Sequence, residues 1–273
     1  MIFQERKSGL VRLSDTVKIS LETCGRTSEE ILAIHNQGEE FFSLQRRTCL
    51  RAMRGEITGD EAEQLIRKAM TPQHAEIAES GAYLQSKLHG QALSTILMCC
   101  FCLESYINSF AWFFVHESDL LGLMRIGRKT SADVLLDAID RLSVKEKWQK
   151  VAQLGDGSGF DHSQRPYQDF KYLFNFRDDH VHDKAVPYSE DRAVRRYNKK
   201  FPDPVSGLLD LNHSLYAAVV YLDMVQELHR LTGVSASDFQ HHYNLAPWFD
   251  EQQLKDLQDT ALCYRAVFPQ DSF

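Results

Sequence analysis

One long apolar segment, residues 92–115, limits the folds open to this chain more than any other feature. Its sequence, ALSTILMCCFCLESYINSFAWFFV, is long enough to cross a bilayer as a helix. Glu104 and Asn108 lie near its middle, where a carboxylate and an amide would each be costly in lipid. These residues and the polar flanks predict a buried helix within a helical protein, with Glu104 and Asn108 one turn apart on one face.

The composition is that of a globular protein, since 43% of the 273 residues are hydrophobic and 25% are charged. A net charge of −7 argues against non-specific coating of nucleic acid, so any contact with RNA or DNA must use a local basic patch. The start, MIFQERKSGLVRL, carries charges where an export signal needs its apolar core. Cys99, Cys100 and Cys102 lack the spacing of a zinc site. We therefore expect reduced thiols, no metal, no cofactor, no membrane contact and a cytoplasmic protein.

Most of the remaining sequence has the apolar spacing and capping signals of helices. Residues 10–22 differ, because their apolar and polar residues alternate as in one or two short strands. Helices are predicted from Ser28 to about Met53, after the capping pair Thr58 and Glu61, from Pro72, over 131–142, in VKEKWQKVAQL, from about Pro166, in SGLLDLNHSLYAAVVYLDMVQELHRLTG up to Gly233, and twice in the tail. GDGSGFDHSQRP is predicted to be a loop. The predicted fold class is mainly all-α, with a short N-terminal β element.

A dense group of ionisable residues follows the apolar stripe of the helix that begins near Pro166. This group, the 177–183 cluster, contains Arg177, Asp178, Asp179, His180, His182 and Asp183. An arginine binds a phosphate through its charge and planar donor fork, and a histidine exchanges a proton near neutral pH. These residue types together suit phosphodiester chemistry.

Four interpretations of the cluster stay open from the residues alone. The aspartates and histidines could bind a metal, but on a helix His180 and His182 point about 200° apart, so this needs irregular backbone. The charges could form a solvated helix end. Arg177 and His182 could act on a phosphodiester, with Asp178 orienting the imidazole from the same helical face. The same groups could also clamp nucleic acid without chemistry.

The order of motifs along the chain adds a further indication. LESYIN in an apolar helix is followed by VKEKW, a glycine-rich loop, PYQDFKYLFNFRDDHVH and a long amphipathic helix, over about residues 85–232. This order resembles the HEPN superfamily, whose domains carry an arginine, then four to six residues and a histidine. The motif maps onto Arg177 and His182, with Asp178 at a polar position where asparagine is commoner. The resemblance implies an antiparallel helical bundle over 85–233, a mostly helical extension over 1–84, and a helical tail over 234–273 packed on the bundle.

The resemblance also implies an activity, that of a metal-independent endoribonuclease of the toxin–antitoxin or phage-defence kind. Its partners would be a second copy in a homodimer, an RNA substrate and an antitoxin protein. His182 would serve as general base or acid in attack by the RNA 2′-hydroxyl, and Arg177 would anchor the phosphate. One helix places these two residues about 140° apart, which is a physical reason for two copies to complete one site.

Other residues are candidates for weaker roles. The supporting residues are Glu104, Asn108, Asp179 and His180, and we expect the cluster's helix to supply hydrogen-bond partners for the first two. The candidate RNA contacts are Arg125, Arg128, Lys129, Arg192, Arg195 and Arg196, which could equally be solvated surface charges.

Two other functions stay open. The alternative to the ribonuclease is a non-catalytic HEPN module for protein or nucleotide binding, and a metal-dependent hydrolase is third. Arg177 and His182 lining an open dimer cleft would favour the enzyme. The same residues buried in salt bridges on a monomer surface would favour the module.

Overall fold

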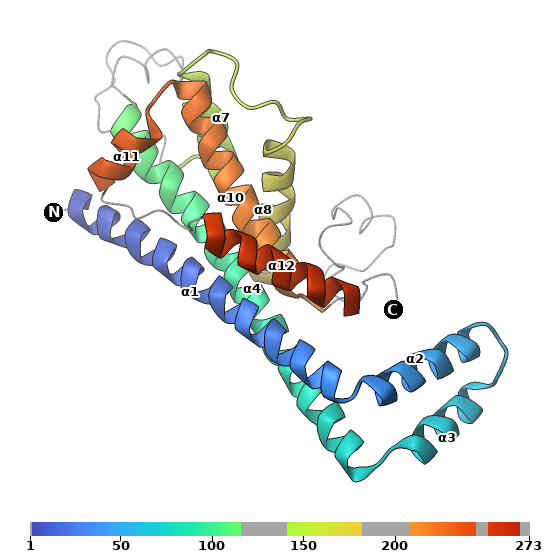
Figure 1. Ribbon diagram of the computed structural model, residues 1–273. Helices are drawn as coiled ribbons and strands as arrows, with labels where there is room; N and C mark the ends of the chain where they lie inside the picture. Colours follow the sequence, from blue (N-terminus) through green and yellow to red (C-terminus); the bar gives the residue numbers. More distant parts are fainter. Residues whose placement is uncertain (1, 116–140, 182–207, 244–250, 268–273) are drawn as a thin grey trace.

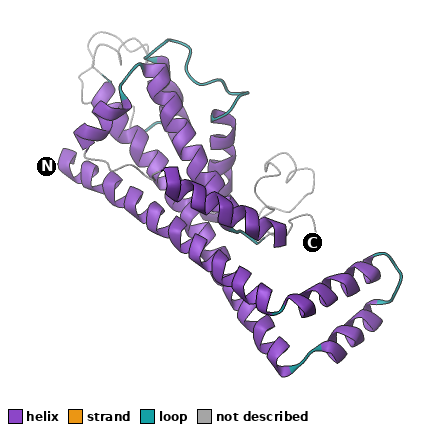
Figure 2. Ribbon diagram, viewed as in Figure 1, coloured by secondary structure: helices purple, strands orange, loops and turns teal. Residues whose placement is uncertain are grey.

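Two long helices, α1 (Ile2–Gln37) and α4 (Pro72–Phe114), lie against each other along the length of the protein (Figure 1). The computed structural model describes residues 2–115, 141–181, 208–243 and 251–267. Within these ranges the protein consists of nine helices and no strand (Figure 2). The all-α fold class is thereby confirmed for the described residues.

The predicted N-terminal β element is wrong, because residues 10–22 lie inside α1. Their buried apolar positions include Val17 and Leu21, both 0% exposed, and the series continues to Cys24. Steps of four and three residues put these side chains on one face of a helix. The packing of this face against α4 decides the structure of a segment whose local pattern also allowed a strand.

The expected helix from Ser28 to Met53 is divided differently in the structure. Ser28 is buried inside α1, where its hydroxyl donates to the Cys24 carbonyl at 2.9 Å. The break falls at Gly38, and α2 runs over Glu39–Met53. A side chain at Gly38 would press on Phe42 and Ile77, so the turn depends on a residue without Cβ.

Several other predicted helix boundaries are confirmed. The capping box of Thr58 and Glu61 begins α3 (Gly59–Ala69), and Pro72 is the first residue of α4. The VKEKWQKVAQL segment forms α7 (Val144–Gln153), and the loop before Pro166 leads into α8 (Tyr167–Val181). Gly233 ends α10 (Leu211–Thr232) in the left-handed conformation. The tail contains α11 (Ala236–Tyr243) and α12 (Glu251–Val267). The helix predicted over 131–142 falls almost wholly outside the described residues.

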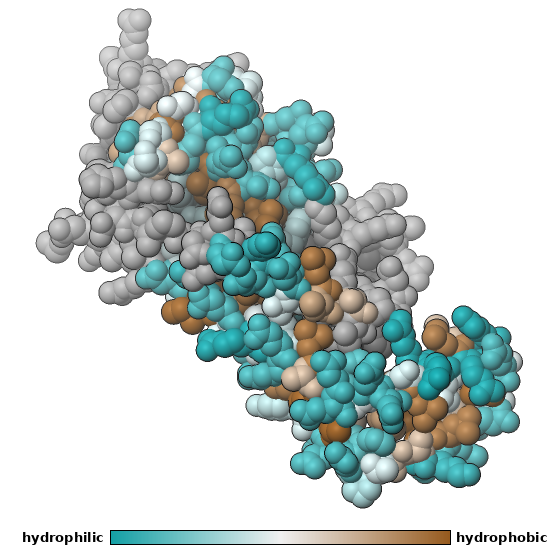
Figure 3. Space-filling view, viewed as in Figure 1, coloured by the Kyte–Doolittle hydropathy of each residue, from teal (hydrophilic) through white to brown (hydrophobic). Residues whose placement is uncertain are grey.

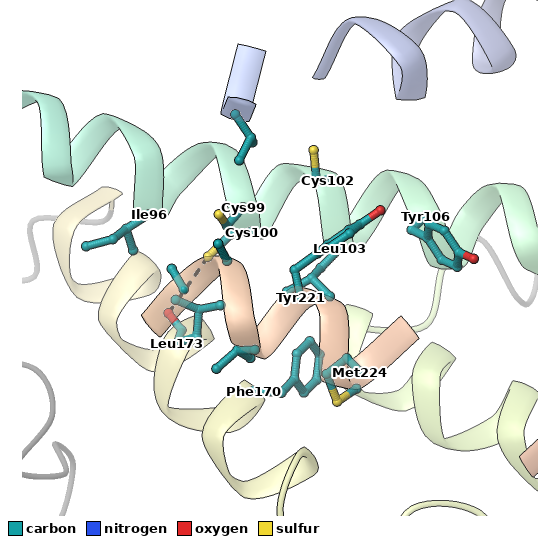
Figure 4. Packing of buried hydrophobic residues seen from close by; sticks show 14 of the residues in the cluster. Ile96, Cys99, Cys100, Cys102, Leu103, Tyr106, Phe170, Leu173, Tyr221 and Met224 are labelled. Atoms are coloured by element: carbon teal, nitrogen blue, oxygen red, sulfur yellow. Dashed lines mark hydrogen bonds between the residues drawn. The ribbon is translucent and has the colours of Figure 1, made fainter. Parts of the chain in front are cut away.

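The C-terminal half of α4 is the central element of the core. Figure 4 shows several of its side chains, Leu103 among them, facing α8 and α10. Phe170 and Leu173 come from α8, and Tyr221 and Met224 come from α10. Among the described helices, α4 has the length and composition to cross a membrane, and 56% of its most apolar window is buried inside the protein.

The helices α2 and α3 form an antiparallel hairpin that projects from the ends of α1 and α4, away from the rest of the protein (Figure 1). We call this hairpin, residues 39–69, the arm. By contrast, α12 packs on α1 and α10. Helix α4 crosses residue 84 without a break, so it joins the arm to the core directly. The division of the chain at residues 84 and 233 stays a prediction.

Candidate functional site

Arg177 lies in the last turn of α8, where that helix packs on α4. Its Nη1 donates to Glu104 Oε2 at 3.2 Å, and its Nε and Nη2 donate to Asp178 Oδ1 at 3.1 and 2.8 Å. The guanidinium carbon stands 4.5 Å from the centroid of the Phe174 ring, within the range of a cation–π contact. The side chain is 19% exposed, so four contacts on three sides hold the guanidinium in place.

The charge of this group is not balanced. One guanidinium faces two carboxylates, which gives the Arg177, Glu104 and Asp178 trio a formal charge of −1. The Glu104 and Asp178 side chains are 41% and 36% exposed, so water screens their attraction to Arg177 in part. An incoming phosphate must compete with these carboxylates for the guanidinium.

Asn108, one turn after Glu104 on α4, binds a different helix. Its Oδ1 accepts a hydrogen bond of 2.8 Å from Lys147 Nζ on α7. The expectation that the cluster's helix would satisfy both polar groups is therefore confirmed for Glu104 and wrong for Asn108. The polar face of α4 therefore contacts two helices, α7 through Asn108 and α8 through Glu104.

Two lysines of α7 are part of this region and were not singled out from the sequence. Lys147 is 6% exposed, and Lys145 Nζ donates to Asn175 Oδ1 of α8 at 2.9 Å. The sequence could have indicated these lysines through Trp148, which lies in the same short helix and is fully buried in the structure. Charged groups close to a buried aromatic residue need polar partners. Exposed aromatic side chains continue the same face of α4, with Phe101 and Trp112 both 38% exposed.

The thiol of Cys100, close to Arg177, is unreactive. Cys100 is 0% exposed, and its Sγ lies 3.9 Å from the Leu173 carbonyl oxygen, drawn as the dashed line in Figure 4. Burial raises the pKa of this thiol strongly, although the positive charge of Arg177 opposes the shift. Cys100 is therefore protonated at neutral pH and is no nucleophile.

The structure describes only part of the predicted site. Arg177, Asp178 and Glu104 come together, and Asn108 lies one turn away. His182 lies outside the described residues, as does every basic residue proposed to contact RNA: Arg125, Arg128, Lys129, Arg192, Arg195 and Arg196. For Asp179 and His180 only the helical backbone is described.

The backbone of α8 bears on the metal interpretation. Helical structure continues to Val181, so the irregular backbone that a chelating pair of histidines requires does not begin before residue 182. Within the described part of the chain, no three His, Cys, Asp or Glu side chains are grouped as a metal site would need.

The comparisons with known proteins add no family assignment. No protein-family model matches the chain, and no curated protein or solved structure is significantly similar to it. The residues and their contacts therefore carry the functional argument.

Proposed function

We propose that this protein is a metal-independent endoribonuclease of HEPN type that works as a homodimer. The observation that carries the proposal is the placement of Arg177. Contacts from both α4 and α8 hold its planar donor fork at the end of α8, next to the segment that contains His182. A fixed guanidinium loses little freedom when it binds a phosphate, which is the preorganisation that phosphodiester cleavage needs.

The chemistry requires three events at one phosphate. The 2′-hydroxyl loses its proton and attacks phosphorus, the phosphate oxygens gain charge, and the 5′-oxygen leaves with a proton. Arg177 would stabilise the charge on the phosphate oxygens. His182 would move the protons, and a second copy would supply the other histidine. The product would be a 2′,3′-cyclic phosphate end. A toxin or phage-defence role, with an antitoxin as partner, belongs to the same proposal.

A second candidate function is a non-catalytic HEPN module that binds a protein or nucleotide. The specific observation that favours it is the pairing of Arg177 with two carboxylates at 19% exposure. In this case the trio is a structural link between α4 and α8. Binding of phosphate would then break ion pairs without any chemical gain.

Incubation of purified protein with several RNAs in EDTA separates these functions. Under the ribonuclease proposal the unmodified protein cleaves, and Arg177→Ala and His182→Ala each slow cleavage by about 100-fold or more. Arg177→Lys keeps the charge facing both carboxylates but loses the donor fork, so it separates anchoring from folding. It should fold normally and still cleave more slowly than the unmodified protein.

Arg165→Ala is the matched control for these variants. Arg165 also pairs with an acid of α8, with Nε 3.1 Å from Asp169 Oδ2, but its side chain is 66% exposed and lies at the opposite end of that helix. This variant should cleave at the unmodified rate. No cleavage of any RNA would refute the ribonuclease and leave the binding module, whereas cleavage lost only on chelation would point to a metal-dependent hydrolase.

A further inference from the structure

Among the described helices, none packs along the arm as a third layer. Its helices α2 and α3 have 15 and 11 residues, lengths at which a helix is marginal without packing. Phe41 and Thr48 of α2 and Ala62 of α3 are its buried residues. Two helices alone bury only the seam between them, so the sides of the arm stay open to solvent.

One side of the arm is hollowed at its base. A cavity of about 660 Å³ is lined by Glu39, Glu40, Phe41, Ser43, Leu44, Arg47, Ala69 and His74. Phe41, Leu44 and Ala69 are its apolar lining residues, and the His74 ring stacks on Phe41 with centroids 4.7 Å apart. Leu65 lies one turn before Ala69 on the same face of α3 and is 44% exposed, so this apolar strip continues toward the tip. Figure 3 shows apolar side chains at the surface of the arm among hydrophilic ones.

Charges on the two helices run in opposite senses along the arm. In α2 the acids Glu39 and Glu40 lie in the first turn, at the base, and the basic Arg51 lies in the last turn, at the tip. In α3 the acids Asp60 and Glu61 lie at the tip, and basic residues occupy the last turn at the base. At each end of the arm one helix is therefore basic and the other acidic.

Acids in the first turn and basic residues in the last turn stabilise each helix dipole. The same arrangement also makes one arm complementary in charge to a second arm. If a second arm lies face to face with the first about a two-fold axis along the arm, each α2 packs antiparallel on the partner's α3. At the tip, and again at the base, basic and acidic helix ends would then alternate around the four helices. Neighbouring helices are antiparallel throughout, as in an up-and-down four-helix bundle.

We propose that the hollowed side of the arm is a self-association surface, which pairs with the arm of a second copy to form an antiparallel four-helix bundle. Leu44 and Leu65 of both chains form its apolar centre. Arg51 of one chain lies opposite Glu61 of the other, because both residues occupy the tip on the hollowed side. Within its own chain Arg51 makes an exposed ion pair with Glu56, at 3.4 Å, and its charge also acts on Glu61; both interactions are weak because they are exposed to water. This pairing is independent of the proposed ribonuclease function.

Sedimentation of the full chain with Leu65→Glu and Met53→Glu variants tests the proposal. Met53 is the matched control, since it is 77% exposed on α2 and lies about 180° from Leu44 around that helix. The unmodified chain, of 31.4 kDa, should self-associate. Leu65→Glu should weaken this association by at least about tenfold, and Met53→Glu should leave it unchanged, whether or not the chains also pair through the ribonuclease site. A monomeric unmodified chain would overturn the proposal, and so would equal association of the Leu65→Glu and Met53→Glu variants.

Charge reversal gives a second test that does not depend on one variant folding well. Arg51→Glu and Glu61→Arg should each weaken association, because each places like charges together at the tip of the four-helix bundle. Glu61→Arg removes the carboxylate that accepts from the Thr58 backbone N–H at 2.8 Å, but the Thr58 hydroxyl still accepts from the backbone N–H of residue 61, so one half of the capping box is kept. Mixing the two variants should restore dimers, because each reversed charge then meets its opposite. Failure of the mixture to associate while both variants keep native far-UV circular dichroism would overturn the charge pairing.

Discussion

Tyr106→Phe is the substitution whose effect follows most directly from the core. His229 Nδ1 lies 2.9 Å from the Val234 carbonyl oxygen, so this nitrogen must carry the proton. Its Nε2 therefore accepts from the Tyr106 hydroxyl at 2.6 Å. Burial raises the pKa of Tyr106, which keeps that hydroxyl protonated and able to donate. The chain of two hydrogen bonds ties α4 to the end of α10 and to the turn before α11.

The cost of the substitution comes from the acceptor that is left behind. Phenylalanine keeps the ring contacts, including that with Phe239 at a centroid distance of 4.9 Å. The Nε2 lone pair of His229 loses its donor in a region where Tyr106 is 2% and His229 7% exposed. An unsatisfied buried acceptor costs about 1–3 kcal/mol. For a protein of this length the melting temperature should fall by about 2–4 °C per kcal/mol.

Urea and thermal unfolding followed by circular dichroism measure this loss. Tyr83→Phe on the same helix is the control, because Tyr83 is 68% exposed and its hydroxyl is free to bind water. That variant should change stability by less than about 0.5 kcal/mol. Equal stabilities of the Tyr106→Phe and Tyr83→Phe proteins would refute the assignment of the His229 tautomer and its buried acceptor.

Three further measurements address other parts of the structure. Burial lowers the pKa of His229, so below about pH 6.5 the unfolded chain binds the proton better and stability falls as pH decreases; the slope of melting temperature against pH should flatten in His229→Gln. A thiol reagent should modify Cys49 and Cys263 in the native protein, and the buried cysteines only after unfolding: Cys24, Cys99, Cys100 and Cys102. Gly155→Ala should lower the unfolding midpoint in urea by more than Gly90→Ala, since a Cβ at 155 would overlap the Leu231 backbone whereas none of the described atoms lies within 4 Å of a Cβ at Gly90.

The sequence predicts the central helix because of two residues. Glu104 and Asn108 argued against a membrane span, and the segment around them is a core helix of the described structure. The capping boxes also locate helix starts well, since their hydrogen bonds lie within four residues of one another. Local signals of this kind survive folding because the residues that make them are already neighbours in the chain.

Long-range partners were harder to predict. Arg177 meets Glu104 across 73 positions, and Lys147 meets Asn108 across 39, so no spacing rule could pair them. The strand prediction for residues 10–22 was wrong for a different reason. Their short pattern fits a strand, but in the structure the segment is part of α1, which packs along α4. Tertiary burial overrode local propensity in α1 and selected the partners of the polar face of α4.

The uninterrupted length of α4 has a mechanical consequence. From Pro72 to Glu104 the chain is one helix, about 48 Å long at its usual rise per residue. Glu104 belongs to this helix, whereas Arg177 belongs to α8, and no loop separates the start of α4 from Glu104. A force on the arm would therefore be transmitted through α4 and would move Glu104 relative to Arg177.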